Sequence, residues 1–235
     1  MKSSNKIFKN GSTTYYYSSI VFPEKVKKDV TDLYAYVRVM DDYVDSTKPK
    51  VKQFTAMWKQ TQACWRGEKV TNRIVTDFVA VAQKHNFKWE WIEAFYRAMR
   101  MDLFKKKYRT YKELETYMYG SAEVIGLMMA QVMHLPQVAF TSAQLQGKAM
   151  QLINFVRDFS EDAHLKRTYL PLEDSKACGS FDALIRFEIN RYYALQKQAA
   201  KGYAHIPRQY LVPIKTAADM YMWTAKVIEK TRQLY

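Results

Sequence analysis

The stretch QLINFVRDFSED (residues 151–162) places two aspartates, Asp158 and Asp162, four residues apart in apolar sequence of helical period. A second stretch, RVMDDYVD (residues 38–45), repeats the spacing with Asp41 and Asp45. A spacing of four residues sets both carboxylates of a pair on one helix face, about one turn apart. Like charges so placed repel each other. The repeated pattern therefore predicts a hard cation such as Mg²⁺, which takes oxygen ligands and keeps positions open for phosphate.

Polar residues form a stripe along the second stretch, where Gln151 and Asn154 precede the two aspartates at helical intervals. Burying unpaired amides and carboxylates is costly, so the stripe predicts a binding surface and not ordinary core. Arg38 and Arg157 accompany the two pairs, and guanidinium groups suit bidentate contacts to phosphate. The alternative is two exposed Arg–Asp patches, which contribute little to stability. The second copy of the pattern favours the site.

The apolar periodicity predicts an all-α protein in which residues 1–235 form a single domain of eight or nine helices. The chain is 48% apolar and holds only seven Gly and six Pro. A helix should begin at Pro23 and Glu24, and Thr141 or Ser142 should cap the helix of the second aspartate pair. The expected helical segments are approximately 24–45, 50–66, 71–85, 88–106, 111–133, the segment that follows Ser142, 180–203 and 208–233.

The net charge of +14 predicts an anionic partner: a diphosphate, an acidic membrane surface or nucleic acid. The sequence contains no recognition-helix, zinc-finger or RNP-type pattern, so we expect no nucleic acid. No apolar run reaches the ~18 residues of a membrane span, and no signal peptide is visible. We therefore expect a cytoplasmic protein, with peripheral association at the membrane left open, that is a monomer or a weak dimer.

Three segments together resemble the squalene/phytoene synthases, the family of head-to-head trans-isoprenyl diphosphate synthases, and are most similar to its microbial phytoene synthases. They are YAYVRVMDDYVD (34–45), YMYGSAEVIG (117–126) and the 151–162 stretch, which runs on to RTYLP (167–171). The resemblance covers nearly the whole chain. One departure is Ser121-Ala122-Glu123, where many members have Val-Ala-Gly, so a carboxylate is expected near the cavity wall.

The resemblance implies an isoprenoid synthase fold with a central cavity between the helices that carry the two DxxxD motifs. It implies Mg²⁺ (or Mn²⁺) held by Asp41, Asp45, Asp158 and Asp162, with Asp42 assisting. Residues expected to contact the substrate diphosphates are Ser12, Thr14, Arg38, Gln151, Asn154 and Arg157. Tyr117 and Tyr221 are expected near the reacting carbons. Cavity depth, and with it the substrate length, is expected to depend on Met118, Ser121, Ile125, Met128 and Met129.

The implied activity is a prenyltransferase reaction that joins two geranylgeranyl diphosphates head to head, through a cyclopropylcarbinyl diphosphate, to give phytoene. Squalene or dehydrosqualene synthesis from farnesyl diphosphate is the alternative, and only squalene synthesis would use NADPH. A non-catalytic assembly or scaffold protein, a basic helical protein that binds nucleic acid or membrane, and a cyclising terpene synthase are further alternatives. The intact aspartate pairs favour the enzyme over all of these.

Overall fold

Local sequence signals account for several of the helix starts in the computed structural model, which describes residues 4, 6–7 and 22–232. Helix α3 (Glu24–Val44) begins directly after Pro23. The Asn72 side chain accepts a hydrogen bond from the Ile74 amide at the start of α5 (Arg73–Lys84), and Ser180 likewise caps α12 (Phe181–Ala199). These short polar side chains satisfy amides that the first helical turn leaves unpaired.

The remaining elements follow in chain order. They are α4 (Val51–Trp65), α6 (Trp89–Met101), α7 (Tyr111–Met118), the π-helical turn η1 (Tyr119–Glu123), α8 (Val124–Val132), the short 3₁₀ turn η2 (Gln137–Ala139), α9 (Phe140–Arg157), α10 (Phe159–His164), α11 (Leu172–Cys178), the 3₁₀ segment η3 (Ala200–His205) and α13 (Arg208–Arg232). The described residues form no β-strand, and their one extended pairing is an isolated bridge between Lys107 and Thr168. The all-α prediction is confirmed.

Two local expectations were wrong, and one helix was missed. Thr141 and Ser142 do not cap a helix, because η2 leads straight into α9 at Phe140 and leaves both residues inside it. The segment that carries the second aspartate pair is not one helix, because α9 ends at Arg157 and α10 begins at Phe159. Helix α11 was not predicted; it ends at Gly179, whose φ of +72° is a left-handed conformation that glycine adopts readily.

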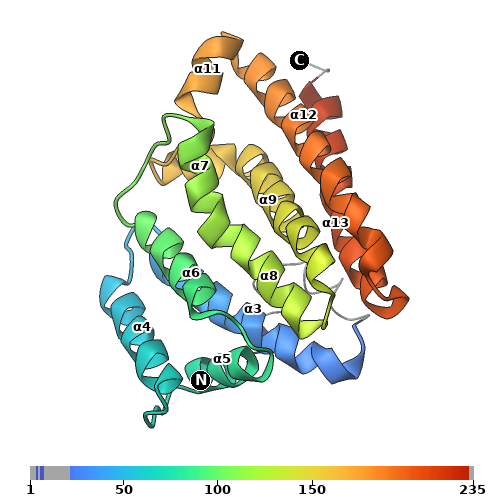
Figure 1. The fold of residues 1–235 in the computed structure, drawn as a ribbon. Helices are drawn as coiled ribbons and strands as arrows, with labels where there is room; N and C mark the ends of the chain where they lie inside the picture. Colours follow the sequence, from blue (N-terminus) through green and yellow to red (C-terminus); the bar gives the residue numbers. More distant parts are fainter. Residues whose placement is uncertain (1–3, 5, 8–21, 233–235) are drawn as a thin grey trace.

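Helix α9 lies in the middle of the molecule, between α8 on one side and α12 on the other (Figure 1). Helix α3 crosses behind α6 and α8 and packs against α4, α5 and α6, whereas α13 packs against α9 and α12. The close approach of α8 and α9 depends on Gly126, because a Cβ there would collide with the backbone of Ala143. Helix α8 thus packs against both helices that carry the aspartate pairs, whereas α4 and α5 pack against α3, and α12 and α13 pack against α9.

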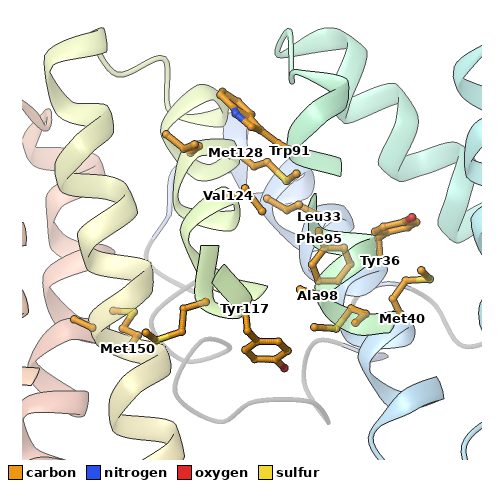
Figure 2. Packing of buried hydrophobic residues seen from close by; sticks show 14 of the residues in the cluster. Leu33, Tyr36, Met40, Trp91, Phe95, Ala98, Tyr117, Val124, Met128 and Met150 are labelled. Carbon is orange, nitrogen blue, oxygen red and sulfur yellow. The ribbon is translucent and has the colours of Figure 1, made fainter. Parts of the chain in front are cut away.

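The hydrophobic core runs continuously from α3 through α6 and α8 to α9 (Figure 2). Tyr36 is fully buried, stacks on Phe78 with ring centroids 3.8 Å apart, and shares a 2.9 Å hydrogen bond with Thr61. Tyr117 lies at the edge of this cluster, with its hydroxyl pointing away from the apolar side chains in Figure 2. That hydroxyl belongs to the polar end of the cavity described below.

Within residues 22–232, no helix has the length and apolar character needed to span a membrane.

Candidate active site

An elongated cavity of about 450 Å³ lies between α3, α8, α9 and α13. The end of α3 and the junction of α9 and α10 lie at one end of it, where Arg167 donates from its guanidinium to Asp45 at 2.7 Å and from its backbone amide to the Asp162 carbonyl at 2.8 Å. The charged residues at this end are Arg38, Asp41, Asp45, Asp102, Arg157, Asp158, Asp162 and Arg167. Apolar side chains line much of the remaining wall, including Val30, Leu33, Met129, Met133, Leu135, Ala139, Ile206 and Ile214.

The first aspartate pair occupies the end of a continuous helix. Asp41 lies within α3, and Asp45 follows its last residue with an amide that donates to the Asp41 carbonyl at 2.8 Å. Arg38 contacts Asp41 at 3.3 Å and Asp42 at 2.8 Å. Removal from water, opposed by Arg38 and reinforced by the Asp45 charge, raises the pKa of Asp41 to about 7.

The second pair spans a break between two helices. Asp158 joins α9 to α10, and the Asp162 amide donates to its carbonyl at 2.9 Å, so the one-turn separation survives the break. Arg157 donates two hydrogen bonds of 2.6 Å to the Asp158 carboxylate. Burial, followed by the charges of Asp158 and Asp45, raises the pKa of Asp162 to about 7.

Arg167 links the two motifs, a role that was not predicted. Its guanidinium donates to Asp45 Oδ1 at 2.7 Å, to the Val44 carbonyl at 2.8 Å and to the Asp102 carbonyl at 3.2 Å. Only 3% of the side chain is exposed. The sequence offered one signal for Arg167. This arginine begins the RTYLP run (167–171), directly after the second aspartate motif.

Asp102 is a second residue that sequence reasoning missed. Its carboxylate accepts hydrogen bonds from the hydroxyls of Tyr117 and Tyr169, both at 2.8 Å. Burial raises its pKa to about 6, although the two hydroxyls oppose this shift. The only sequence signal was an acidic residue between Met101 and Leu103. Asp102 thereby orients Tyr117 and Tyr169 at the cavity wall.

Most of the predicted site residues line this one cavity. They are Arg38, Asp41, Asp45, Tyr117, Gln151, Asn154, Arg157, Asp158, Asp162 and Tyr221. Asp42 is not part of the wall; half of its side chain is exposed and it pairs with Arg38. Ser12 and Thr14 lie outside the described residues.

The expected depth residues divide into two groups. Ser121, Ile125 and Met129 line the cavity. Met118 and Met128 are fully buried in the core and are not among the lining residues, so they do not form the wall directly. Residues four positions apart share a helix face, which is why Ser121, Ile125 and Met129 all line the cavity. Met118 and Met128 instead pack against the rest of the core.

The donor groups at the charged end fit a hard divalent cation. Five carboxylates line the cavity, four of them from the two aspartate pairs, and Asn154 Oδ1 is buried there without a hydrogen-bond partner among the described residues. No three acidic, His or Cys side chains of the described chain are gathered closely enough to form a ready-made metal cluster. Asp41, Asp45 and Asp158 instead pair with Arg38, Arg167 and Arg157. These arginines offset the repulsion that a cation would otherwise relieve.

Known proteins similar to this chain include two bacterial 15-cis-phytoene synthases. The protein from Paracoccus sp. is 28% identical over 72% of this chain, and that from Synechocystis sp. is 26% identical over 92%. The chain spans 59% of the Paracoccus protein and 72% of the Synechocystis protein. Among solved structures, squalene synthase HpnC from Alicyclobacillus acidocaldarius superposes with a TM-score of 0.86 at 18% identity, covering 97% of this chain and 92% of that one.

This structural likeness shows the isoprenoid synthase fold expected from the sequence. Residues 8–234 match the family model described as squalene/phytoene synthase, which is nearly the whole chain. With this match, the chain belongs to the squalene/phytoene synthase family.

Proposed function

We propose that this chain, as a single domain, condenses two geranylgeranyl diphosphates head to head to give phytoene in a Mg²⁺-dependent reaction. The observation that carries the proposal is one cavity that joins a carboxylate- and arginine-rich end to an apolar interior. Such a cavity is matched to a substrate with a diphosphate head and a hydrocarbon tail. Membership of the family supports the same reaction class.

The charged end supplies the groups that an anionic leaving group requires. Arg38 and Arg157 line this end and are proposed to contact the diphosphate, and Arg167 donates a hydrogen bond to Asp45. Asp41, Asp45, Asp158 and Asp162 would hold Mg²⁺, and Mn²⁺ suits the same oxygen donors. The bound metal would neutralise the developing charge of the leaving diphosphate. Gln151 and Asn154 face the same space and are proposed to contact the diphosphates.

The proposed reaction proceeds through two ionisations. Loss of diphosphate from one substrate leaves an allylic cation, which the double bond of the second substrate attacks to give a new carbocation. Loss of a proton from that carbocation closes the three-membered ring of the cyclopropylcarbinyl diphosphate. A second loss of diphosphate, rearrangement and loss of a proton join the two C1 atoms through a central double bond. The aromatic faces of Tyr117, Phe155 and Tyr169 at the wall suit the cations. The reaction requires that bound substrate exclude the water that would trap these cations.

Dehydrosqualene or squalene synthesis from farnesyl diphosphate is the second candidate, because the charged end would serve a 15-carbon substrate equally well. NADPH would be needed for squalene only. A scaffold role is less favoured, since all four aspartates of the two motifs face the cavity. Prenyl diphosphates are thus the proposed partners, with peripheral membrane association left as a hypothesis for vesicle-binding measurements.

The test is incubation of the purified protein with Mg²⁺ and either geranylgeranyl or farnesyl diphosphate, with and without NADPH, followed by identification of the extracted hydrocarbon. A 40-carbon triene without NADPH is the expected product. A 30-carbon product would move the assignment to the second candidate. The absence of product from a folded protein with both substrates would overturn the proposed enzyme activity.

A further inference from the structure

Deep in the cavity, three polar side chains form a closed hydrogen-bonded triangle. Gln146 of α9 and Gln196 of α12 exchange hydrogen bonds of 2.8 and 3.1 Å. The Tyr203 hydroxyl of η3 donates to Gln146 Oε1 at 2.8 Å and lies 3.0 Å from Gln196 Nε2, which donates to it. Gln146 and Tyr203 line the cavity, and Gln196 is buried behind them. We call these three residues the collar.

The collar satisfies the hydrogen bonds of its amides and also restrains the cavity wall. Amides beside a hydrocarbon are unfavourable unless their hydrogen bonds are satisfied, and the triangle satisfies them internally. It ties α9, α12 and η3 together at one depth. Gly202 adjoins it and packs so closely on Ser142 that a Cβ would collide with that side chain. The width of the cavity at this depth is therefore set by several mutually supporting contacts.

The position of the collar along α9 corresponds to a defined tail length. Gln146 precedes Asp158 by twelve residues, which is about 18 Å of helix, and the cavity continues to Ser142 at about 24 Å. An extended carbon chain advances about 1.2 Å per bond, so each four-bond isoprene unit spans about 5 Å. A 15-carbon tail thus spans about 14 Å and a 20-carbon tail about 19 Å.

Because the diphosphate lies between the carboxylates and the first carbon of the tail, a 15-carbon tail ends near the collar. The fourth isoprene unit of a 20-carbon tail must pass the collar and lie against Ser142 and Ala143, both of which line the cavity. We propose that Gln146, Gln196 and Tyr203 form a collar that grips the fourth isoprene unit and selects 20-carbon over 15-carbon prenyl diphosphates. This inference rests on the proposed function, which supplies the prenyl diphosphate class.

The test measures binding and not turnover, so that its outcome is separate from the product assay above. Non-hydrolysable thiolo-diphosphate analogues with 15 and 20 carbons are titrated calorimetrically into the protein with Mg²⁺. Gln146→Phe should obstruct the passage and lower the affinity for the 20-carbon analogue at least ~tenfold, while the 15-carbon affinity changes less than ~threefold. Gln198→Phe, which adds the same ring at an exposed position of α12, is the matched control and should leave the ratio unchanged.

Tyr203→Phe provides a second, milder variant if Gln146→Phe does not fold. It removes only the hydroxyl that closes the triangle, and it should reduce the preference for the 20-carbon analogue by ~two- to fivefold. Equal changes in both affinities, no change in either variant, or a wild-type preference for the 15-carbon analogue would overturn the collar. The expected binding shift without hydrocarbon product would uphold the collar and overturn the proposed reaction. No binding of either analogue would overturn both.

Discussion

The two aspartate pairs share one sequence spacing but not one structure. Asp41 and Asp45 close a continuous helix, whereas Asp158 and Asp162 lie on either side of a helix break. Arg38 contacts Asp41 from the preceding turn, whereas Arg157 binds the aspartate next to it in the chain. In the first motif Asp45 depends on Arg167, which lies just beyond the second motif. The spacing of four residues thus defines where the carboxylates lie along the chain, and the arginines define how each is held.

This difference separates two kinds of residue at the charged end. The Arg157 side chain is 45% exposed and lines the cavity. Arg167 is nearly fully buried and connects Asp45, the end of α3 and the Asp102 backbone. Substitutions can therefore test whether binding and structural support are divided between the two arginines.

The largest effect is expected from removing one carboxylate of either pair. Asp41→Ala and Asp158→Ala should each lower kcat at least ~hundredfold, because each removes a proposed ligand and an electrostatic stabiliser. The measurement is steady-state turnover of geranylgeranyl diphosphate, with circular dichroism to check the helical fold. Near-normal turnover by both variants would refute the assignment of the aspartates to a metal site.

The affinity for Mg²⁺ should rise with pH. The pKa values of Asp41 and Asp162 are raised to about 7, so both carboxyls are largely protonated at pH 6 and must lose protons to bind metal. Affinity should increase roughly tenfold from pH 6 to pH 8 for each of these carboxyls that binds the ion. Calorimetric titration with Mg²⁺ at the two pH values measures this, and Asp162→Asn should remove its share of the dependence.

The same pKa shifts have the opposite effect on stability without metal. The folded protein retains protons that the unfolded chain, with an ordinary aspartate pKa of 3.8, has already released. This stabilisation is complete below about pH 4 and disappears as the pH rises through about 7.

The prediction on metal affinity has a clear contrary outcome. An affinity for Mg²⁺ that does not change between pH 6 and pH 8 would contradict the role given to these two carboxyls.

The paired substitutions Arg167→Met and Arg157→Met should affect different quantities. Loss of Arg167 leaves the Asp45 carboxylate without its guanidinium partner and takes one of two donors from each of the Val44 and Asp102 carbonyls. This should lower the free energy of unfolding by about 3–5 kcal/mol. Loss of Arg157 should change it by less than about 1 kcal/mol and should instead raise the KM for the diphosphate substrate. Denaturant unfolding and substrate kinetics distinguish the two, and equal destabilisation by both would remove the distinction.

Asp102→Asn should have a moderate effect on stability. An amide has one acceptor oxygen, so Tyr117 and Tyr169 could not both keep their present hydrogen bonds. The free energy of unfolding should fall by about 1–3 kcal/mol. Asp219→Asn is a matched control, because Asp219 is largely exposed and pairs only with Lys215 in the part of the chain that the structure describes. A similar change in both variants would argue against the buried tyrosine network.

The smallest effect is expected at Asp42, the neighbour of Asp41. Asp42 is half exposed and lies outside the cavity wall, so Asp42→Asn should lower turnover by less than ~threefold. Comparison with Asp41→Ala tests whether an aspartate of the motif must line the cavity to contribute to turnover. A loss as large as that of Asp41→Ala would make Asp42 a full member of the proposed metal site.

Several features of the site could not be predicted because they depend on contacts between distant residues. The Arg167–Asp45 ion pair joins positions 122 residues apart. Glu123 was expected near the cavity wall, but it is not among the lining residues and its carboxylate lies 3.5 Å from Lys148 of α9. The break at Asp158 was missed because the apolar period continues across it. Each of these outcomes depends on neighbours supplied by the fold.

The sequence by itself determined the helical class and the pairing of aspartates on two helix faces, because a period of 3.6 residues is a local property of the backbone. It also carried the motifs that connect the chain to its family. Only the tertiary structure decided which arginine holds which aspartate, which hydroxyls meet Asp102, and how far the cavity extends. These properties arise where segments far apart in the sequence pack together, and no local pattern encodes the distance between them.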